Sequence, residues 1–220
     1  MKLAQGSQAF IIVCLCLLIC SFLLTLYSST FLILFIFSLI FLTFLITFFR
    51  DPDRSPPSNK SFVLSPAEGR VYAIESLPDT LKIQIRMSLF NVHVTRSPIS
   101  GKIISIARYP GSFWPMLPFI KRSSEKNARQ IIQIQGKDFM LEVIQIAGIF
   151  ARRCVCYKRE NDIVTRGSKL GIIRFGSEVD LVFPTKLGVQ VLVQKGDKVR
   201  TGETPVAKII NPKEGESSLS

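Results

Sequence analysis

The chain has 220 residues, of which 47% are hydrophobic, and its formal net charge at pH 7 is +12. No charged residue occurs between Lys2 and Arg50. This excludes an ordinary soluble domain over that stretch, and the length allows a smaller domain behind a membrane anchor. The one His and five Cys match neither a His-rich metal site, a zinc spacing nor a disulfide framework. We therefore expect a reducing compartment and no metal.

Two apolar runs precede the first basic cluster. Residues 9–26 and 31–49 each approach the length of about 20 apolar residues that a membrane-spanning helix needs. The polar stretch 27–30 separates them, so the sequence predicts a transmembrane helical hairpin in residues 1–50. Such a hairpin places both of its ends on one side, and the basic domain beyond it favours the cytoplasmic side of the cell membrane. A secretory signal followed by a single anchor is the alternative.

The rest of the chain is basic. Residues 51–220 contain 26 of the 28 Lys and Arg and all 16 Asp and Glu, and therefore carry a net charge of +10. A basic domain tied to a membrane favours an anionic membrane surface as its partner. Nucleic acid is not expected, because the sequence has no interleaving of aromatic and basic residues and no helix-turn-helix pattern.

Alternating apolar residues and turn signals indicate a β domain. Residues 51–60 (DPDRSPPSNK) are a Pro- and Ser-rich linker. Strands are then predicted near 62–64, 70–76, 81–88, 90–95, 102–108, 130–136, 138–146, 152–157, 170–175, 178–183 and 189–194. Residues 61–220 should thus form a mainly β domain, a sandwich or flattened barrel. Residues 109–127 have no clear period and are expected to be a long loop, and residues 188–209 a plain hairpin.

Five short stretches occur in an order and at a spacing that carry chemical meaning. They are FFRDP at 48–52, SPAEG at 65–69, FNVHV at 90–94, QIAG at 145–148 with ARR at 151–153, and GIIRFGS at 171–177. Together they resemble the short, membrane-bound form of the phosphatidylserine decarboxylase proenzymes. The resemblance covers nearly the whole chain.

The resemblance implies a pyruvoyl enzyme that makes its cofactor from its own backbone. The hydroxyl of Ser177 would attack the carbonyl carbon of Gly176, where the lack of a Cβ leaves room for the approach. The resulting ester would break without hydrolysis and give a larger chain, 1–176, and a smaller chain, 177–220, that begins with a pyruvoyl group. That ketone would form a Schiff base with phosphatidylserine and take up the electrons released with CO2, so that phosphatidylethanolamine is the product.

The resemblance also assigns roles to side chains. His93 is the only His and the candidate for proton transfer, because an imidazole ordinarily gains and loses a proton near neutral pH. Glu68 stands where many relatives have Asp, and it is a possible partner of Ser177 in self-cleavage; a solvated turn residue is the alternative. Arg96 stands where the longer bacterial forms have a second His.

Two further stretches are candidates for substrate contact. Arg152 and Arg153 could hold the lipid phosphate or carboxylate, since a guanidinium group matches such oxyanions. Strand alternation puts them on opposite faces, so at most one should reach the site; the same alternation puts Arg174 and Ser177 on opposite faces. The apolar residues 113–117 could dip into the bilayer edge, or they could pack on the core.

Three functions remain open from the sequence. The first is the self-processing decarboxylase. The second is a non-enzymatic, membrane-anchored β domain that has lost processing. The third is a pyruvoyl decarboxylase of another lipid or of an amino acid. A homodimer is plausible for a basic β domain on a membrane.

Overall fold

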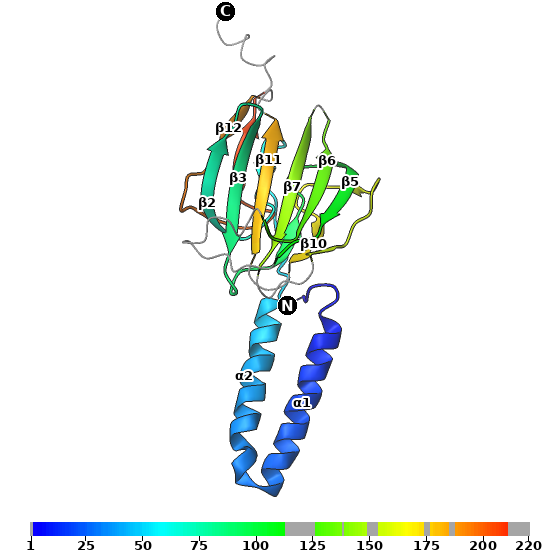
Figure 1. Ribbon diagram of the computed structural model, residues 1–220, viewed down its shortest axis with the longest axis vertical. Coiled ribbons are helices and arrows are strands. Elements are labelled where there is room, and N and C mark those ends of the chain that lie inside the picture. Colours follow the sequence, from blue (N-terminus) through cyan, green and yellow to red (C-terminus); the bar gives the residue numbers. More distant parts are fainter. Residues whose placement is uncertain are drawn as a thin grey trace, which may run out of the picture. The chain divides into compact units, whose positions relative to one another are not determined.

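The computed structural model describes residues 2–112, 126–137, 139–148, 154–173, 177–184 and 188–210, and at Ser177 it describes the backbone alone (Figure 1). The chain divides into two compact units, Met1–Asp53 and Arg54–Ser220. The division falls inside the stretch 51–60 that the sequence indicates as a linker.

The first unit is a helical hairpin. Helix α1 (Gln8–Tyr27) and helix α2 (Leu32–Phe48) are joined by the short 3₁₀ helix η1 (Ser29–Phe31). The two helices are long and apolar enough to cross a membrane. Most of their large apolar side chains are not covered by other residues of the protein. At the open end, the N–H of Ala4 donates to the carbonyl of Phe49 at 2.8 Å. The predicted pair of apolar N-terminal helices is confirmed.

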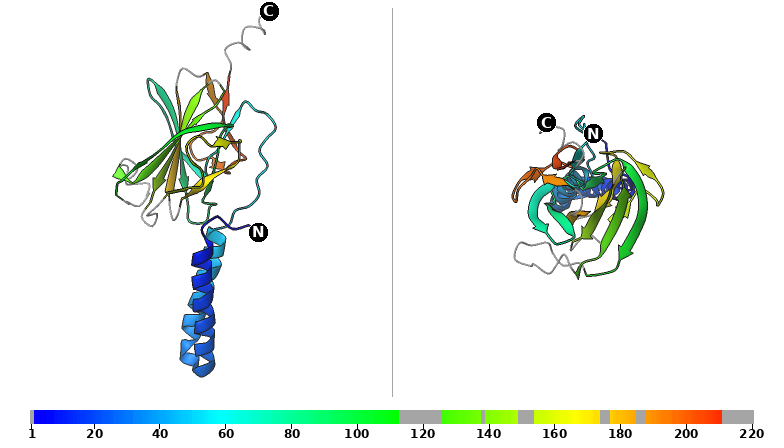
Figure 2. Two further views of the ribbon diagram at one scale, coloured as in Figure 1. Left: turned by 90° about the vertical axis from the view of Figure 1, so that its right-hand side faces the viewer. Right: turned by 90° about the horizontal axis from the view of Figure 1, so that it is seen from above.

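The second unit is built from strands, whose arrangement is seen from two further sides in Figure 2. Its largest sheet has eight antiparallel strands in the order β13-β2-β3-β11-β7-β6-β5-β9. Their bounds are β2 Gly69–Ser76, β3 Thr80–Met87, β5 Gly101–Tyr109, β6 Arg129–Gln135, β7 Met140–Ala147, β9 Ile163–Val164, β11 Ser177–Pro184 and β13 Lys198–Val199. The strands of this sheet follow an arc when seen from above, so the sheet is curled like part of a barrel (Figure 2, right).

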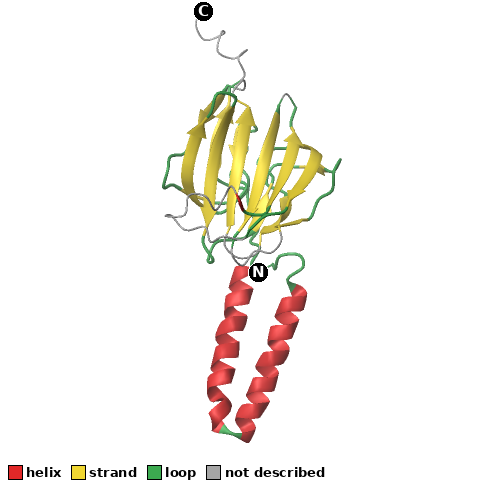
Figure 3. Ribbon diagram, viewed as in Figure 1, coloured by secondary structure: helices red, strands yellow, loops and turns green. Residues whose placement is uncertain are grey.

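Two smaller antiparallel sheets are described in the same unit; Figure 3 colours the strands yellow and the helices of the first unit red. One has the order β1-β14-β12 and the other β4-β10-β8. Their bounds are β1 Phe62–Leu64, β4 Val94–Arg96, β8 Cys154–Cys156, β10 Lys169–Ile173, β12 Val189–Val191 and β14 Pro205–Ile209. The expected mainly β architecture is confirmed.

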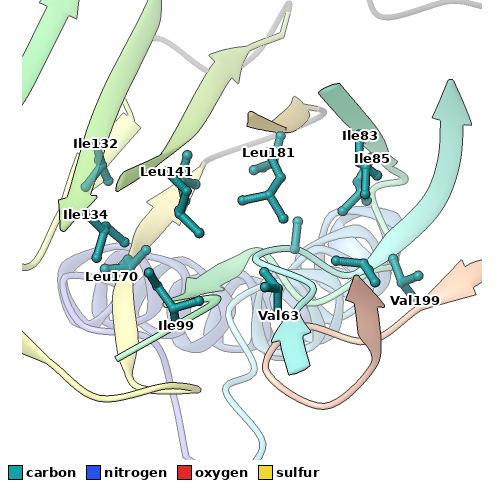
Figure 4. Packing of buried hydrophobic residues seen from close by; sticks show 14 of the residues in the cluster. Val63, Ile83, Ile85, Ile99, Ile132, Ile134, Leu141, Leu170, Leu181 and Val199 are labelled. Carbon is teal, nitrogen blue, oxygen red and sulfur yellow. The ribbon is translucent and has the colours of Figure 1, made fainter. Parts of the chain in front are cut away.

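The core lies between the large sheet and the smaller ones. Every second residue of β11 from Val179 to Phe183, including Leu181, packs in this core, as strand periodicity requires. Ile83 and Ile134 face the same core from the neighbouring strands, and Val63 and Leu170 reach it from the two smaller sheets (Figure 4). Burial of this apolar surface is the main source of the domain's stability.

Some predicted strand boundaries were wrong. The strand expected at 90–95 begins only at Val94, because Asn91 folds the preceding residues into a turn: its Oδ1 accepts hydrogen bonds from the backbone N–H and the hydroxyl of Ser88, each at 2.8 Å. Strands β9 and β13 were not predicted, since they have two residues each. Strand β14 is the return strand of the hairpin that was expected over residues 188–209. Strand β14 pairs with β12, from Val189 opposite Ile209 onward.

Candidate active site

Position 177 lies inside the large sheet, at the beginning of an interior strand. The backbone of Ser177 pairs with Met87 of β3 on one side and with Ala147 of β7 on the other. Beyond Ala147 lies Ala128, whose carbonyl accepts a hydrogen bond from the N–H of Ala147 at 2.9 Å. Beyond Met87 lies Gly69, the first residue of β2. The motif stretches that contain Gly69, Ala147 and Ser177 therefore meet along one row of the sheet.

Gly69 is required by close packing in this row. A Cβ atom at this position would lie 2.1 Å from the carbonyl oxygen of Arg86 and 3.3 Å from Cα of Met87. Real side chains do not come so close to a backbone oxygen, so only glycine fits without moving β3.

His93 is fully buried beside the chain that leads to position 177. It directly precedes β4, and its carbonyl accepts a hydrogen bond from the N–H of Ile173 at 3.2 Å. Ile173 is the last residue of β10, four positions before Ser177. The structure thus brings the backbone of the only His next to the segment that carries the GIIRFGS motif.

Glu68 is held in a network and is not a solvated turn residue. Its side chain is 15% exposed, and its Oε2 contacts Nη2 of Arg54 at 2.5 Å. Its Oε1 accepts a hydrogen bond from the N–H of Val92 at 3.1 Å, and Val92 precedes His93. Arg54, which is 9% exposed, also pairs with Glu203 at 3.2 Å. Glu68 therefore fixes the backbone next to the buried His.

Arg54 was not singled out from the sequence. It stands in the Pro- and Ser-rich stretch after the anchor, where a charged residue is usually solvated. Its two carboxylate partners are 14 and 149 positions away in the chain. No local sequence pattern predicts an ion pair between residues that are so far apart in the chain.

Arg96 has a structural position. It is 7% exposed, its Nη1 donates to the carbonyl of Gly167 at 3.1 Å, and its backbone N–H donates to the carbonyl of Pro66 at 3.0 Å. Its side chain therefore supports the turn at Gly167, and its backbone supports the SPAEG stretch.

A chain of polar side chains crosses the sheet behind this region. The Nε of Arg108 donates to Oε1 of Gln130 at 3.1 Å, Nε2 of Gln130 donates to Oε1 of Gln145 at 3.0 Å, and Nε2 of Gln145 donates to the hydroxyl of Thr95 at 2.7 Å. Gln130, Gln145 and Thr95 are all buried. Buried amides need such partners, so the chain fixes the relative positions of β4, β7 and β6.

Two buried acids follow position 177 on β11. Glu178 pairs with Nε of Arg86 at 2.7 Å, and Asp180 pairs with Nζ of Lys82 at 2.8 Å. Burial, and secondarily the charge of Glu178, raises the pKa of Asp180 to about 7, although Lys82 acts in the opposite direction. Asp180 therefore titrates near neutrality in the folded protein.

The comparisons with known proteins agree with this geometry. The family model described as phosphatidylserine decarboxylase matches residues 41–207. The chain belongs to the phosphatidylserine decarboxylase family. A relative from Chlorobium chlorochromatii (strain CaD3) is 42% identical over 178 residues, which cover 78% of this chain and 82% of the relative. A relative from Pelobacter propionicus is 39% identical, covering 87% and 85% respectively. Both are named phosphatidylserine decarboxylase proenzyme.

Several expected site residues of this decarboxylase family member lie outside the described residues. They are Gly176, Arg152, Arg153, Arg174 and the apolar residues 113–117. Within the described ranges, no group of three or more His, Cys, Asp or Glu could hold a metal ion.

Burial raises the pKa of the Cys154 thiol to about 12, so this cysteine is protonated at neutral pH and is a poor nucleophile.

Proposed function

We propose that the chain is a self-processing decarboxylase that converts phosphatidylserine to phosphatidylethanolamine and CO2 in phospholipid biosynthesis. The observation that carries the proposal is the match of the decarboxylase family over residues 41–207, together with the meeting of three family-like motifs around position 177. A non-enzymatic β domain would need neither. A pyruvoyl decarboxylase of another lipid or of an amino acid is disfavoured by the names of the relatives and by the apolar helices.

Self-cleavage is proposed to use the hydroxyl of Ser177. Its oxygen bonds to the carbonyl carbon of Gly176 and the amide nitrogen leaves that carbon, which gives an ester. Loss of the Cα proton then releases the carboxylate of Gly176, and hydrolysis of the remaining enamine gives a ketone and ammonia. The larger chain, 1–176, keeps the helical hairpin, and the smaller chain, 177–220, begins at β11.

A pyruvoyl group is compatible with the described surroundings of position 177. Ser177 is the first residue of β11, so a break before it leaves the pairing of Glu178 and later residues with β3 and β7 intact. Its direct strand neighbour on β7, Ala147, has a short side chain, which leaves space on that side of the row. The group supplies a carbonyl that takes up the substrate amine and the electrons released with CO2.

The side chains near this position divide the remaining work. His93 is proposed to transfer protons, because it is the chain's only imidazole and its backbone lies beside Ile173. Glu68 is proposed to support self-cleavage as a positioning residue, since it holds Val92 while Arg54 balances its charge. Either Arg152 or Arg153 remains a candidate for contact with the lipid head group.

The setting of the enzyme is also a proposal. The helices α1 and α2 support attachment to the cell membrane. The basic charge of the following unit favours the cytoplasmic side and an anionic lipid surface. A homodimer stays a prediction.

One denaturing gel and one substrate panel test the function. The wild-type protein should run as two fragments that correspond to 1–176 and 177–220, and Ser177→Ala should run as one uncut chain. Ser61→Ala, at an exposed serine, is the matched control and should be cut. The cut protein should release CO2 from phosphatidylserine and not from free serine. An uncut wild-type chain, or activity on free amino acids alone, would contradict the proposal.

A further inference from the structure

A cavity of about 560 Å³ lies beside the row that contains position 177. It is bounded by the ends of β2 and β3, by β13 and by the turn after β3. Among its ten lining residues are Glu68, Arg70, Arg86, Met87, Lys198 and Arg200. Met87 is the direct strand partner of Ser177, so the cavity begins one strand away from the proposed reacting group.

Positive charge dominates this cavity. Four of its ten lining residues are Arg or Lys, against the single acid Glu68. Glu68 is already paired with Arg54. Arg70, Lys198 and Arg200 make no ion pair with any residue in the described part of the chain. An anion of the right size would therefore meet cations that are not neutralised.

The strand register forces like charges together here. Lys198 of β13 lies directly opposite Arg70 of β2, and Arg70 lies directly opposite Arg86 of β3. Like charges in such cross-strand positions lower the stability of a sheet. A row of three cations that opposes folding is expected where function requires it, and binding of an anion would relieve the repulsion.

Arg86 is held rigidly at this row. Its guanidinium carbon lies 3.3 Å from the centre of the Tyr72 ring, and its Nε donates to Glu178. Its Nη1 is buried and has no hydrogen-bond partner among the residues that the structure describes. Buried donors normally have partners, so the place beside Arg86 is incomplete without another acceptor.

The distances suit a phosphodiester joined to a serine head group. Neighbouring strands are about 4.8 Å apart, so Arg86, Arg70 and Lys198 lie about one, two and three strand spacings from β11, on the face of the sheet opposite to that of Met87. In phosphatidylserine, only the β-carbon and the ester oxygen separate the serine α-carbon from phosphorus. Because Met87, the direct partner of position 177, lines the cavity together with these cations, a substrate whose amine reacts at position 177 can reach past the strand ends and place its phosphodiester there.

We propose that the cavity binds the phosphodiester of the lipid head group, with Arg70, Lys198 and Arg200 as its contacts. The proposal rests on the function proposed above and gives the phosphate a place distinct from Arg152 and Arg153. The site is composite, since Arg70 belongs to the larger chain of the processed enzyme and the other two residues to the smaller chain. Removal of the cations should therefore weaken binding and leave self-cleavage unchanged.

The test compares two double variants of the full-length enzyme in detergent micelles with phosphatidylserine. Lys198→Gln with Arg200→Gln should raise KM at least tenfold with little change in kcat, and both fragments should still appear on the gel. Lys102→Gln with Lys137→Gln removes the same charge from exposed positions at the opposite end of the sheet and should leave KM unchanged. Should the first double variant fail to fold, Arg70→Gln alone is measured. A KM at least threefold higher supports the site, and an unchanged KM overturns it.

Soluble anions identify the ligand chemistry. Glycerophosphoglycerol, a diester without an amine, should inhibit the wild type competitively and inhibit the Lys198/Arg200 variant at least tenfold less. Inhibition by inorganic phosphate alone would mean an adventitious ion site and would overturn the proposal. An uncut or inactive wild type would refute the decarboxylase function itself, whereas an active wild type with unchanged KM in the cavity variants would refute only the phosphodiester site.

Discussion

Replacement of Arg54 by Ala is the sharpest perturbation of the network around His93. The substitution leaves two carboxylates, Glu68 and Glu203, without their shared cation, and their side chains are only 15% and 27% exposed. Removal of one partner from a buried pair costs roughly 3–5 kcal/mol, and the remaining solvent contact of Glu203 favours the lower end, about 3 kcal/mol. For a domain of this size, that lowers Tm by about 6–12 °C.

Thermal unfolding followed by circular dichroism measures the effect. Arg159→Ala removes an exposed arginine and should change the free energy of unfolding by less than about 0.5 kcal/mol. The double variant Arg54→Ala with Glu68→Ala should be more stable than the sum of the single losses predicts, by at least about 1 kcal/mol, because the two residues interact directly. Strictly additive losses would refute the ion pair. Fragments should also accumulate more slowly in Arg54→Ala, since Glu68 then no longer holds Val92 as firmly.

Three further predictions concern the sheet that carries position 177. Leu181→Ala deletes a fully buried side chain of β11 and should lower the free energy of unfolding by about 3 kcal/mol in thermal denaturation; the exposed Leu192→Ala is the control, and equal losses would contradict the described core. Gln145→Ala leaves the buried Gln130 of β6 and the buried Thr95 of β4 without this partner and should cost about 1–3 kcal/mol, whereas a neutral result would contradict the polar chain. The raised pKa of Asp180, about 7, means that the folded state binds a proton that the unfolded state has lost above about pH 4. Stability should therefore fall as the pH rises from about 4 to about 7 and level off above 7, and Asp180→Asn should remove that fall from a Tm-against-pH curve; an unchanged curve would contradict the assignment.

The helical hairpin could be predicted from the sequence closely. The expected spans 9–26 and 31–49 differ from α1 and α2 by only one residue at each end. Polar residues on both sides of an apolar run leave little choice in where a membrane helix begins and ends. The six longer strands of the large sheet were predicted almost as well, since their core-facing side chains alternate along the strand, whereas the two-residue strands β9 and β13 were missed. The segment around Asn91 was not, because its alternation resembles a strand while a side-chain hydrogen bond makes it a turn.

The candidate site could be predicted only in part. The motifs marked Ser177, His93 and Glu68, and the structure places their segments in one region. Arg54 could not be found, because its role depends on a carboxylate 149 positions away. The cross-strand row of Lys198 and Arg70 depends on pairing register, which no local pattern specifies.

The interior position of β11 has a consequence for how the mature enzyme is made. This strand is bonded on both edges, and β14, from the same proposed fragment, lies between β1 and β12. Folding must therefore insert both strands before the peptide bond is cut, and release of the smaller piece afterwards would require the sheets to come apart. Each processed molecule should therefore retain the smaller chain from its own precursor. When isotope-labelled and unlabelled preparations are mixed after processing, they should not exchange their smaller chains.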